Sequence, residues 1–164
     1  MVAAGILWRD GRILICQRRA SQDHALKWEF PGGKLESAES PAEALVRELR
    51  EELGIEASLP LELTRYTFAY PGRKAILLVF LEVPGWRGEI VNHIFERMEW
   101  AAPEELAGYD FLEGDVGFLQ WLRAHPRGAH SPRTHSPRAQ SPRTHSPRTH
   151  PPRTHPPRAS EPRP

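Results

Sequence analysis

The chain has 164 residues and a formal net charge of +1 at pH 7, yet its composition changes abruptly near His125. Residues 126–164, here called the tail, hold 11 Pro, 8 Arg and 5 His but only three hydrophobic residues, all Ala. Such a stretch cannot form a packed core, which excludes a second folded domain. The other 61 hydrophobic residues lie in residues 1–125, which suits one domain of the commonest size.

Charge divides in the same way. The tail has a net charge of +7 because its 8 Arg face one acid, Glu161, and this leaves 14 basic and 20 acidic residues in residues 1–125. An acidic domain has no electrostatic basis for binding nucleic acid over its own surface. Nucleic acid is therefore expected as a partner only weakly, and through the tail.

Cysteine content and the N-terminal residues indicate a compartment. Cys16 is the only cysteine, which excludes an intramolecular disulfide and a zinc site with several thiolates. The apolar run at residues 2–8 stops at Arg9 and Asp10, so it is too short for a signal peptide or a membrane span. We expect a soluble cytoplasmic protein that does not contact a membrane.

The chain opens with a predicted hairpin and a loop of functional interest. Residues 2–8 and 12–18 are strand-like runs around Asp10-Gly11, a pair that tolerates the positive φ angles of a tight turn. In residues 28–33, Pro31 and two glycines are expected to prevent regular structure and to let the backbone approach a ligand closely. A simple tight turn is the alternative interpretation.

Residues 40–54 give the clearest helix signal. Ser40 is the predicted N-cap, Pro41 the first helical residue and Glu43 the partner in a capping box, while Gly54 ends the helix. Apolar side chains recur at helical spacing on a stripe about 100° wide that would face a core. They are Ala42, Leu45, Val46, Leu49 and Leu53.

The remaining elements complete an α/β pattern. Two longer strands are predicted at residues 61–70 and 74–83, on either side of a Pro71-Gly72 turn. A short strand at 97–100, a helical turn at 103–106 and a last helix at 116–124 follow. Strands on both sides of a central helix, with another helix at the end, indicate a layered α/β domain.

Three carboxylates on the central helix form the main chemical feature. Glu48, Glu51 and Glu52 stand at i, i+3 and i+4, so they project from one side of the helix, away from the apolar stripe. Carboxylate oxygens are hard ligands suited to Mg²⁺ or Mn²⁺, and the backbone carbonyls of Gly32-Gly33 offer further ligands. A solvated acidic helix face is the alternative that spacing alone leaves open.

This region resembles the Nudix box in full. The pattern reads Gly33, five residues, Glu39, seven residues, Arg47-Glu48-Leu49, one residue, Glu51-Glu52, one residue, Gly54 and Ile55. The preceding segment, Trp28-Glu29-Phe30-Pro31-Gly32-Gly33-Lys34, resembles the MutT-like branch of the Nudix hydrolases. The resemblance extends over about residues 2–124 and implies a Nudix fold, with a mixed β-sheet between helices.

The resemblance also implies a chemistry. MutT-like proteins hydrolyse nucleoside triphosphates to nucleoside monophosphate and pyrophosphate, which points here to Mg²⁺ as cofactor, with Mn²⁺ as a substitute, and to oxidised dGTP as substrate. Carried over by position, Glu48, Glu51 and Glu52 with a carbonyl of Gly32 or Gly33 would hold the metal. Arg47 and Glu39 would orient the carboxylates, and either Glu48 or Glu52 would be the general base.

One departure from the family concerns a loop before Trp100. Many relatives supply a further carboxylate there, but residues 91–96 place no acid clearly at that position. Glu89 or Glu96 as a substitute ligand, and His93 as a base, are the options, and a purely structural role is the alternative for each.

Six residues are assigned to the substrate by the same resemblance. Arg19 and Arg73 are expected to reach phosphate, Phe30 and Tyr70 to line a base pocket, and Asp115 to read the edge of the base, while Lys34 is a further substrate-binding candidate. Surface exposure is the alternative for the arginines, core packing for the aromatics, and the N-cap of the last helix for Asp115. An ionised Asp115 only accepts hydrogen bonds, which suits oxidised guanine and cytosine nucleotides alike.

The tail repeats with a period of five from Ser131, and its regular prolines favour a disordered, extended chain. We expect a monomer with its domain at residues 1–125. Rival functions are a Nudix hydrolase of CTP, 5-methyl-dCTP, ADP-ribose, dinucleotides or capped RNA, and a non-catalytic Nudix-fold binding module.

Overall fold

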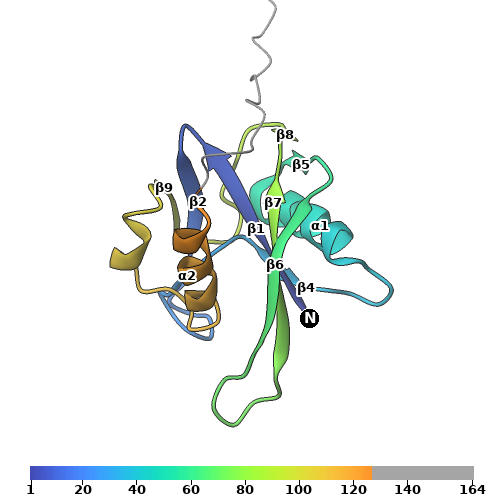
Figure 1. Ribbon diagram of the computed structural model, residues 1–164. Helices are drawn as coiled ribbons and strands as arrows, with labels where there is room; N and C mark the ends of the chain where they lie inside the picture. The colour runs from blue at the N-terminus through green and yellow to red at the C-terminus, as the bar shows by residue number, and fades with distance from the viewer. Residues whose placement is uncertain (127–164) are drawn as a thin grey trace, which may run out of the picture. The chain divides into compact units, whose positions relative to one another are not determined.

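A computed structural model describes residues 1–126 (Figure 1). Residues 127–164 of the tail lie outside the described residues, so the disorder expected for them stays a prediction. The end of the domain at residue 125 also stays a prediction. No helix in residues 1–126 is both long enough and apolar enough to cross a membrane.

A seven-stranded mixed sheet lies at the centre of the fold. Its strands are β1 (Val2–Arg9), β2 (Arg12–Gln17), β3 (Trp28–Glu29), β4 (Gly32–Lys34), β6 (Leu61–Phe68), β7 (Ile76–Val83) and β9 (Arg97–Ala101). The order is β3-β2-β1-β7-β6, with β4 paired to β1 and β9 paired to β2. Only the β1–β7 pair is parallel among the pairs of this sheet, which makes the sheet mixed. The short strands β5 (Glu56–Ala57) and β8 (Trp86–Arg87) pair separately.

Helices cover both faces of the sheet (Figure 1). Because strand residues alternate between faces, Ile6 and Phe80 pack with α2 (Val116–Ala124) and the 3₁₀ helix η1 (Leu106–Gly108), whereas Leu7 and Val79 pack under α1 (Pro41–Leu53). This arrangement of layers confirms the predicted α/β Nudix fold.

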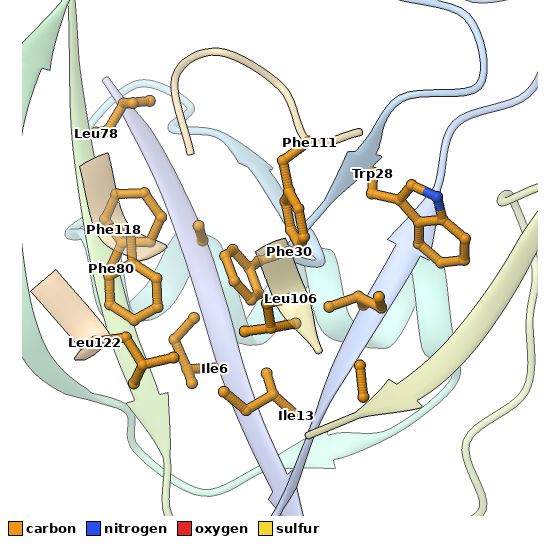
Figure 2. Packing of buried hydrophobic residues seen from close by; sticks show 13 residues of the cluster. Ile6, Ile13, Trp28, Phe30, Leu78, Phe80, Leu106, Phe111, Phe118 and Leu122 are labelled. Carbon is orange, nitrogen blue, oxygen red and sulfur yellow. The ribbon is translucent and has the colours of Figure 1, made fainter. Parts of the chain in front are cut away.

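Aromatic rings pack against one another in the core on the α2 side, among aliphatic side chains, as Figure 2 shows. The ring of Phe30 lies 5.3 Å from Phe111 and 5.3 Å from Phe118, and Phe118 stacks on Phe80 at 4.5 Å. Phe30 is therefore 3% exposed and packs in the core, which is the alternative that the sequence left open for this residue.

Both helices form where local signals predicted them. In α1, Ser40 Oγ accepts from Glu43 N–H and Glu43 Oε2 accepts from Ser40 N–H at 2.9 Å, so the capping box is complete. Gly54 ends the helix in the left-handed region at φ 68°. The last helix spans residues 116–124 as predicted, and the strand predicted at 97–100 is confirmed as β9.

Other predictions need correction. Residues 28–33 are not irregular, because β3 and β4 lie on either side of Pro31 and find pairing partners in β2 and β1. The strands around the Pro71-Gly72 turn are shorter than predicted, ending at Phe68 and beginning at Ile76. The turn expected at 103–106 extends further than predicted, because the turn at residues 103–105 continues into the 3₁₀ helix Leu106–Gly108.

Candidate active site

Glu52 is held against the backbone of β4. Its side chain lies on the last turn of α1, is 6% exposed, and accepts a hydrogen bond from Gly32 N–H at 2.8 Å. Gly32 has φ +137°, and a Cβ there would lie 2.2 Å from the Ala3 carbonyl oxygen of β1. Only glycine fits between β1 and the helix carboxylate at this point.

Glu48 packs against the next glycine. A Cβ on Gly33 would lie 2.4 Å from Glu48 Oε1 and 2.5 Å from its carboxyl carbon. The structure therefore brings Glu48 and Glu52 together with Gly32 and Gly33, as the sequence predicted.

Arg47 fixes the direction of the neighbouring carboxylates. Its guanidinium donates to Glu39 through two atoms, at 2.8 and 3.0 Å, to Glu48 Oε1 at 2.9 Å, and to the Lys34 carbonyl at 3.1 Å. The hydrogen bonds from Arg47, together with one from Glu36 N–H, lower the pKa of Glu39 to about 2. Arg47 and Glu39 thus support Glu48 without lying beside Glu52.

Glu51 does not join the other two helix carboxylates. Its side chain is 60% exposed and lies 3.5 Å from Arg47 Nη1. Within residues 1–126 no group of three His, Cys, Asp or Glu side chains is arranged to hold a metal ion. Helical spacing places the three glutamates on one side of α1, but Glu48 and Glu52 turn onto the glycines while Glu51 extends toward solvent.

The electrostatics of Glu52 favour a cation beside it. Burial, as the largest cause, and the charges of Glu48, Glu29 and Glu51 together raise the pKa of Glu52 to about 9, against the opposing hydrogen bond from Gly32 N–H. A divalent cation would offset this excess of negative charge. The oxygen donors present, two carboxylates and the glycine backbone, are those that Mg²⁺ and Mn²⁺ prefer.

A cavity of about 210 Å³ is lined by the two glycines that contact Glu48 and Glu52. Gly32 and Gly33 form part of its wall, and so do four residues that the sequence assigned to substrate: Phe30, Lys34, Tyr70 and Asp115. A larger hollow of about 490 Å³ lies near Trp8 and Leu122, but none of its lining residues belongs to this carboxylate site. The smaller cavity is therefore the candidate pocket.

Asp115 forms the buried end of this pocket. It is 7% exposed and accepts from Phe30 N–H at 3.4 Å, and it occupies the N-cap position of α2 without a capping side-chain bond. Burial, and next the charge of Glu29, raise the pKa of Asp115 to about 8. The raised pKa favours the neutral carboxyl, which can donate as well as accept, over the ionised form considered in the sequence analysis.

Asp115→Asn should flatten the dependence of stability on pH. A carboxyl whose pKa is higher in the folded state stabilises fully below its unfolded pKa, near 4, and loses that contribution as pH rises to about 8. Urea unfolding of metal-free protein should show wild type losing up to about 1 kcal/mol per pH unit relative to the variant over this range. Asp10→Asn, in the exposed hairpin turn, is the matched control, and parallel curves for wild type and Asp115→Asn would contradict the assignment.

Comparisons with known proteins show the family of this chain. The NUDIX domain family model matches residues 1–122. The chain belongs to the NUDIX family. An E. coli (strain K12) CTP pyrophosphohydrolase is 43% identical over 123 residues, covering 75% of this chain and 90% of the relative. A Haemophilus influenzae 8-oxo-dGTP diphosphatase is 46% identical over 122 residues, covering 74% and 89%.

Solved structures agree with this assignment. The solution structure of the E. coli ORF135 protein has 41% identity and a TM-score of 0.67, over 78% of this chain and 93% of that one. A structure from a study of MutT from Aliivibrio salmonicida and Vibrio cholerae has 28% identity and a TM-score of 0.66, over 76% and 96%. The chain is therefore a Nudix pyrophosphohydrolase with MutT-like relatives.

Two residues of the Nudix pocket were missed by the sequence analysis. Arg18 and Glu29 both line the cavity, and Arg18 Nη1 donates to both carboxylate oxygens of Glu29 at 3.0 and 2.8 Å. Burial raises the pKa of Glu29, against the opposing charge of Arg18. The sequence did carry a signal for this pair, because Glu29 lies between the aromatic residues Trp28 and Phe30. An acid flanked by buried aromatic residues needs a charged or hydrogen-bonding partner.

The two arginines predicted to bind phosphate lie elsewhere. Arg19 donates to the His93 carbonyl at 3.2 Å, and Arg73 lies 3.6 Å from Asp23 with a 63% exposed side chain. Neither lines the 210 Å³ cavity. Their contact with substrate stays a prediction.

The loop before Trp100 supplies no buried acid to the site. Glu89 and Glu96 are exposed, and the His93 ring lies over Gly54, where a Cβ would be 3.0 Å from Nε2. The loop instead contacts the C-terminal end of α1 through backbone hydrogen bonds.

Proposed function

We propose that this Nudix enzyme hydrolyses nucleoside triphosphates to nucleoside monophosphate and pyrophosphate, with Mg²⁺ as its metal and 8-oxo-dGTP as its preferred substrate. The observation that carries the proposal is the continuity of the pocket with the carboxylates, because Gly32 and Gly33 belong to both. A nucleotide carries its base at one end and its polyphosphate at the other. One bound molecule can therefore fill the pocket and reach Glu48 and Glu52.

The glutamates of α1 form the proposed metal site. Glu48 and Glu52, with a backbone carbonyl of Gly32 or Gly33, would hold the ion, and Glu51 would join them once its exposed side chain turned away from Arg47. Nudix hydrolases generally use divalent metals. Held by these residues, a divalent ion would supply charge neutralisation of the polyphosphate and would lower the pKa of a water molecule. Arg47 and Glu39 keep Glu48 in place, and Mn²⁺ is a suitable substitute.

The pocket residues form the proposed nucleotide site. Lys34 would pair with phosphate, aided by Arg19 and Arg73, while Tyr70 would stack on the base and Phe30 would support it from the core. Asp115 would bind the base edge, since a neutral carboxyl offers one donor and one acceptor. A site that satisfies such groups rejects analogues that leave them unpaired.

Hydrolysis of CTP or 5-methyl-dCTP is the second candidate. One observation favours it, the similarity to the E. coli CTP pyrophosphohydrolase. A neutral Asp115 is compatible with it, since such a carboxyl can accept from the cytosine amino group while donating to the base. Oxidised guanine offers donors and acceptors to the same carboxyl, so this pocket chemistry alone does not separate the two bases.

A substrate panel tests the proposal. The values of kcat/KM with Mg²⁺ and Mn²⁺ should be highest for 8-oxo-dGTP among 8-oxo-dGTP, dGTP, dCTP, CTP, 5-methyl-dCTP and ADP-ribose, with pyrophosphate as a product. A preference for cytosine nucleotides would establish the second candidate, and release of AMP from ADP-ribose alone would overturn both. The same panel on a chain ending at His125 is the control for the tail, and unchanged turnover is expected.

The biological role belongs to the same proposal. Removing oxidised dGTP before DNA replication would place the enzyme in the cytoplasm, acting as a monomer on small nucleotides.

A further inference from the structure

The last turn of α1 carries Glu51 and Glu52, so its rigidity bears directly on the site. The final carbonyls of any helix have no partner within the helix, and such ends fray unless other groups bond to them. Gly54 N–H closes back onto the Arg50 carbonyl at 3.0 Å. The carbonyls of Glu52 and Leu53 lie beyond the reach of that cap.

A surface loop supplies the missing partners. His93 N–H donates to the Glu52 carbonyl at 3.0 Å, and Val91 N–H donates to the Leu53 carbonyl at 2.9 Å. Glu52 is thereby held at two points, its carboxylate by Gly32 N–H and its carbonyl by His93 N–H. These contacts join the residue to β4 and to the loop, which approach it from different parts of the chain.

Asn92 closes this loop. Its Oδ1 accepts from Phe95 N–H at 2.8 Å and its Nδ2 donates to the Phe95 carbonyl at 3.1 Å, so one side chain fixes both backbone groups of Phe95. Phe95 is 5% exposed and packs in the same cluster as Leu49 and Leu53 of α1. The loop is thus anchored in the core under the helix that it caps.

We propose that Asn92 is a positioning residue for the metal-binding end of α1. By closing the loop it aims the N–H groups of Val91 and His93 at the helix carbonyls, and so limits the movement of Glu51 and Glu52. The inference rests on the proposed function for the metal, but not on the identity of the nucleotide. Positioning of the helix end would also be a role for this loop, which offers no buried carboxylate to the site.

The test compares Asn92→Ala with Asn92→Ser and with Glu105→Ala. Serine keeps an uncharged acceptor able to form a similar, weaker turn. Glu105 is the matched control, because its Oε2 closes a different loop by accepting from Ala102 N–H at 2.8 Å. Mn²⁺ binding is measured by electron paramagnetic resonance without nucleotide, and hydrogen exchange of the Gly54 amide reports the opening of the helix end.

Asn92→Ala should weaken Mn²⁺ binding about tenfold and speed exchange at Gly54, with Asn92→Ser intermediate and Glu105→Ala like wild type. On the best substrate, kcat should fall for Asn92→Ala while KM changes less than about twofold, because no residue of the pocket is altered. Mn²⁺ affinity equal to that of Glu105→Ala would overturn the proposal. Wild type that binds Mn²⁺ but hydrolyses no nucleotide would instead overturn the proposed function.

Discussion

Replacing Glu52 with glutamine should lower the turnover of the best nucleotide substrate by a factor of about 10² to 10⁴, while the protein stays folded. The loss follows because an amide can neither take up a proton as a base nor serve as an anionic ligand for a divalent ion. The fold should persist because burial raises the pKa of Glu52 to about 9, so the metal-free protein already holds a neutral side chain there. Glutamine has the same shape and can still accept from Gly32 N–H.

Steady-state kinetics and urea unfolding together decide this prediction. Glu56→Gln is the matched control, because Glu56 is an exposed glutamate close to the end of α1 that pairs with Arg87 at 3.3 Å. Its turnover should stay within about twofold of wild type. If Glu52→Gln kept most of the wild-type turnover, Glu52 would have no role in the chemistry; if it unfolded, its effect would not report on the metal site.

Local signals account for what the sequence predicted well. The cap residues Ser40 and Gly54 and the spacing of Glu48 and Glu52 act within a few residues, so the boundaries of α1 and its acidic side followed directly. The Nudix box runs from Gly33 to Ile55 and contains this helix, which is why the family and the glycines beside the carboxylates were predicted together.

Long-range contacts account for what was missed. The strands β3 and β4 form only because β2 and β1 lie beside them, so Pro31 and two glycines gave a misleading local signal. The raised pKa of Asp115 depends on burial and on the charge of Glu29, against a hydrogen bond from Phe30 N–H, and both residues lie far from Asp115 in the sequence. The sequence likewise carries no pattern for two features of the loop at residues 91–95. These are the hydrogen bonds by which Asn92 closes the loop and the contact of the loop with the end of α1.

The two adjacent glycines of β4 should respond very differently to alanine. At Gly32, a side chain would need φ +137°, a region that L-residues rarely adopt, and its Cβ would lie 2.2 Å from the Ala3 carbonyl oxygen. That oxygen belongs to β1 in the middle of the sheet and cannot move aside. Gly32→Ala should therefore lower the free energy of unfolding by about 3 kcal/mol or more, as measured by urea denaturation.

At Gly33, by contrast, the atoms in the way belong to the Glu48 carboxylate, whose Oε1 lies 2.4 Å from the point that a Cβ would occupy, and a side chain can rotate. Gly33→Ala should keep most of the stability but displace Glu48, with a loss of Mn²⁺ affinity and of turnover. Gly108→Ala is the control, because nothing lies within 4 Å of a Cβ there. Equal stability losses at the two sites would mean that β4 moves as a unit, and Glu48 would then not be held by contact with Gly33.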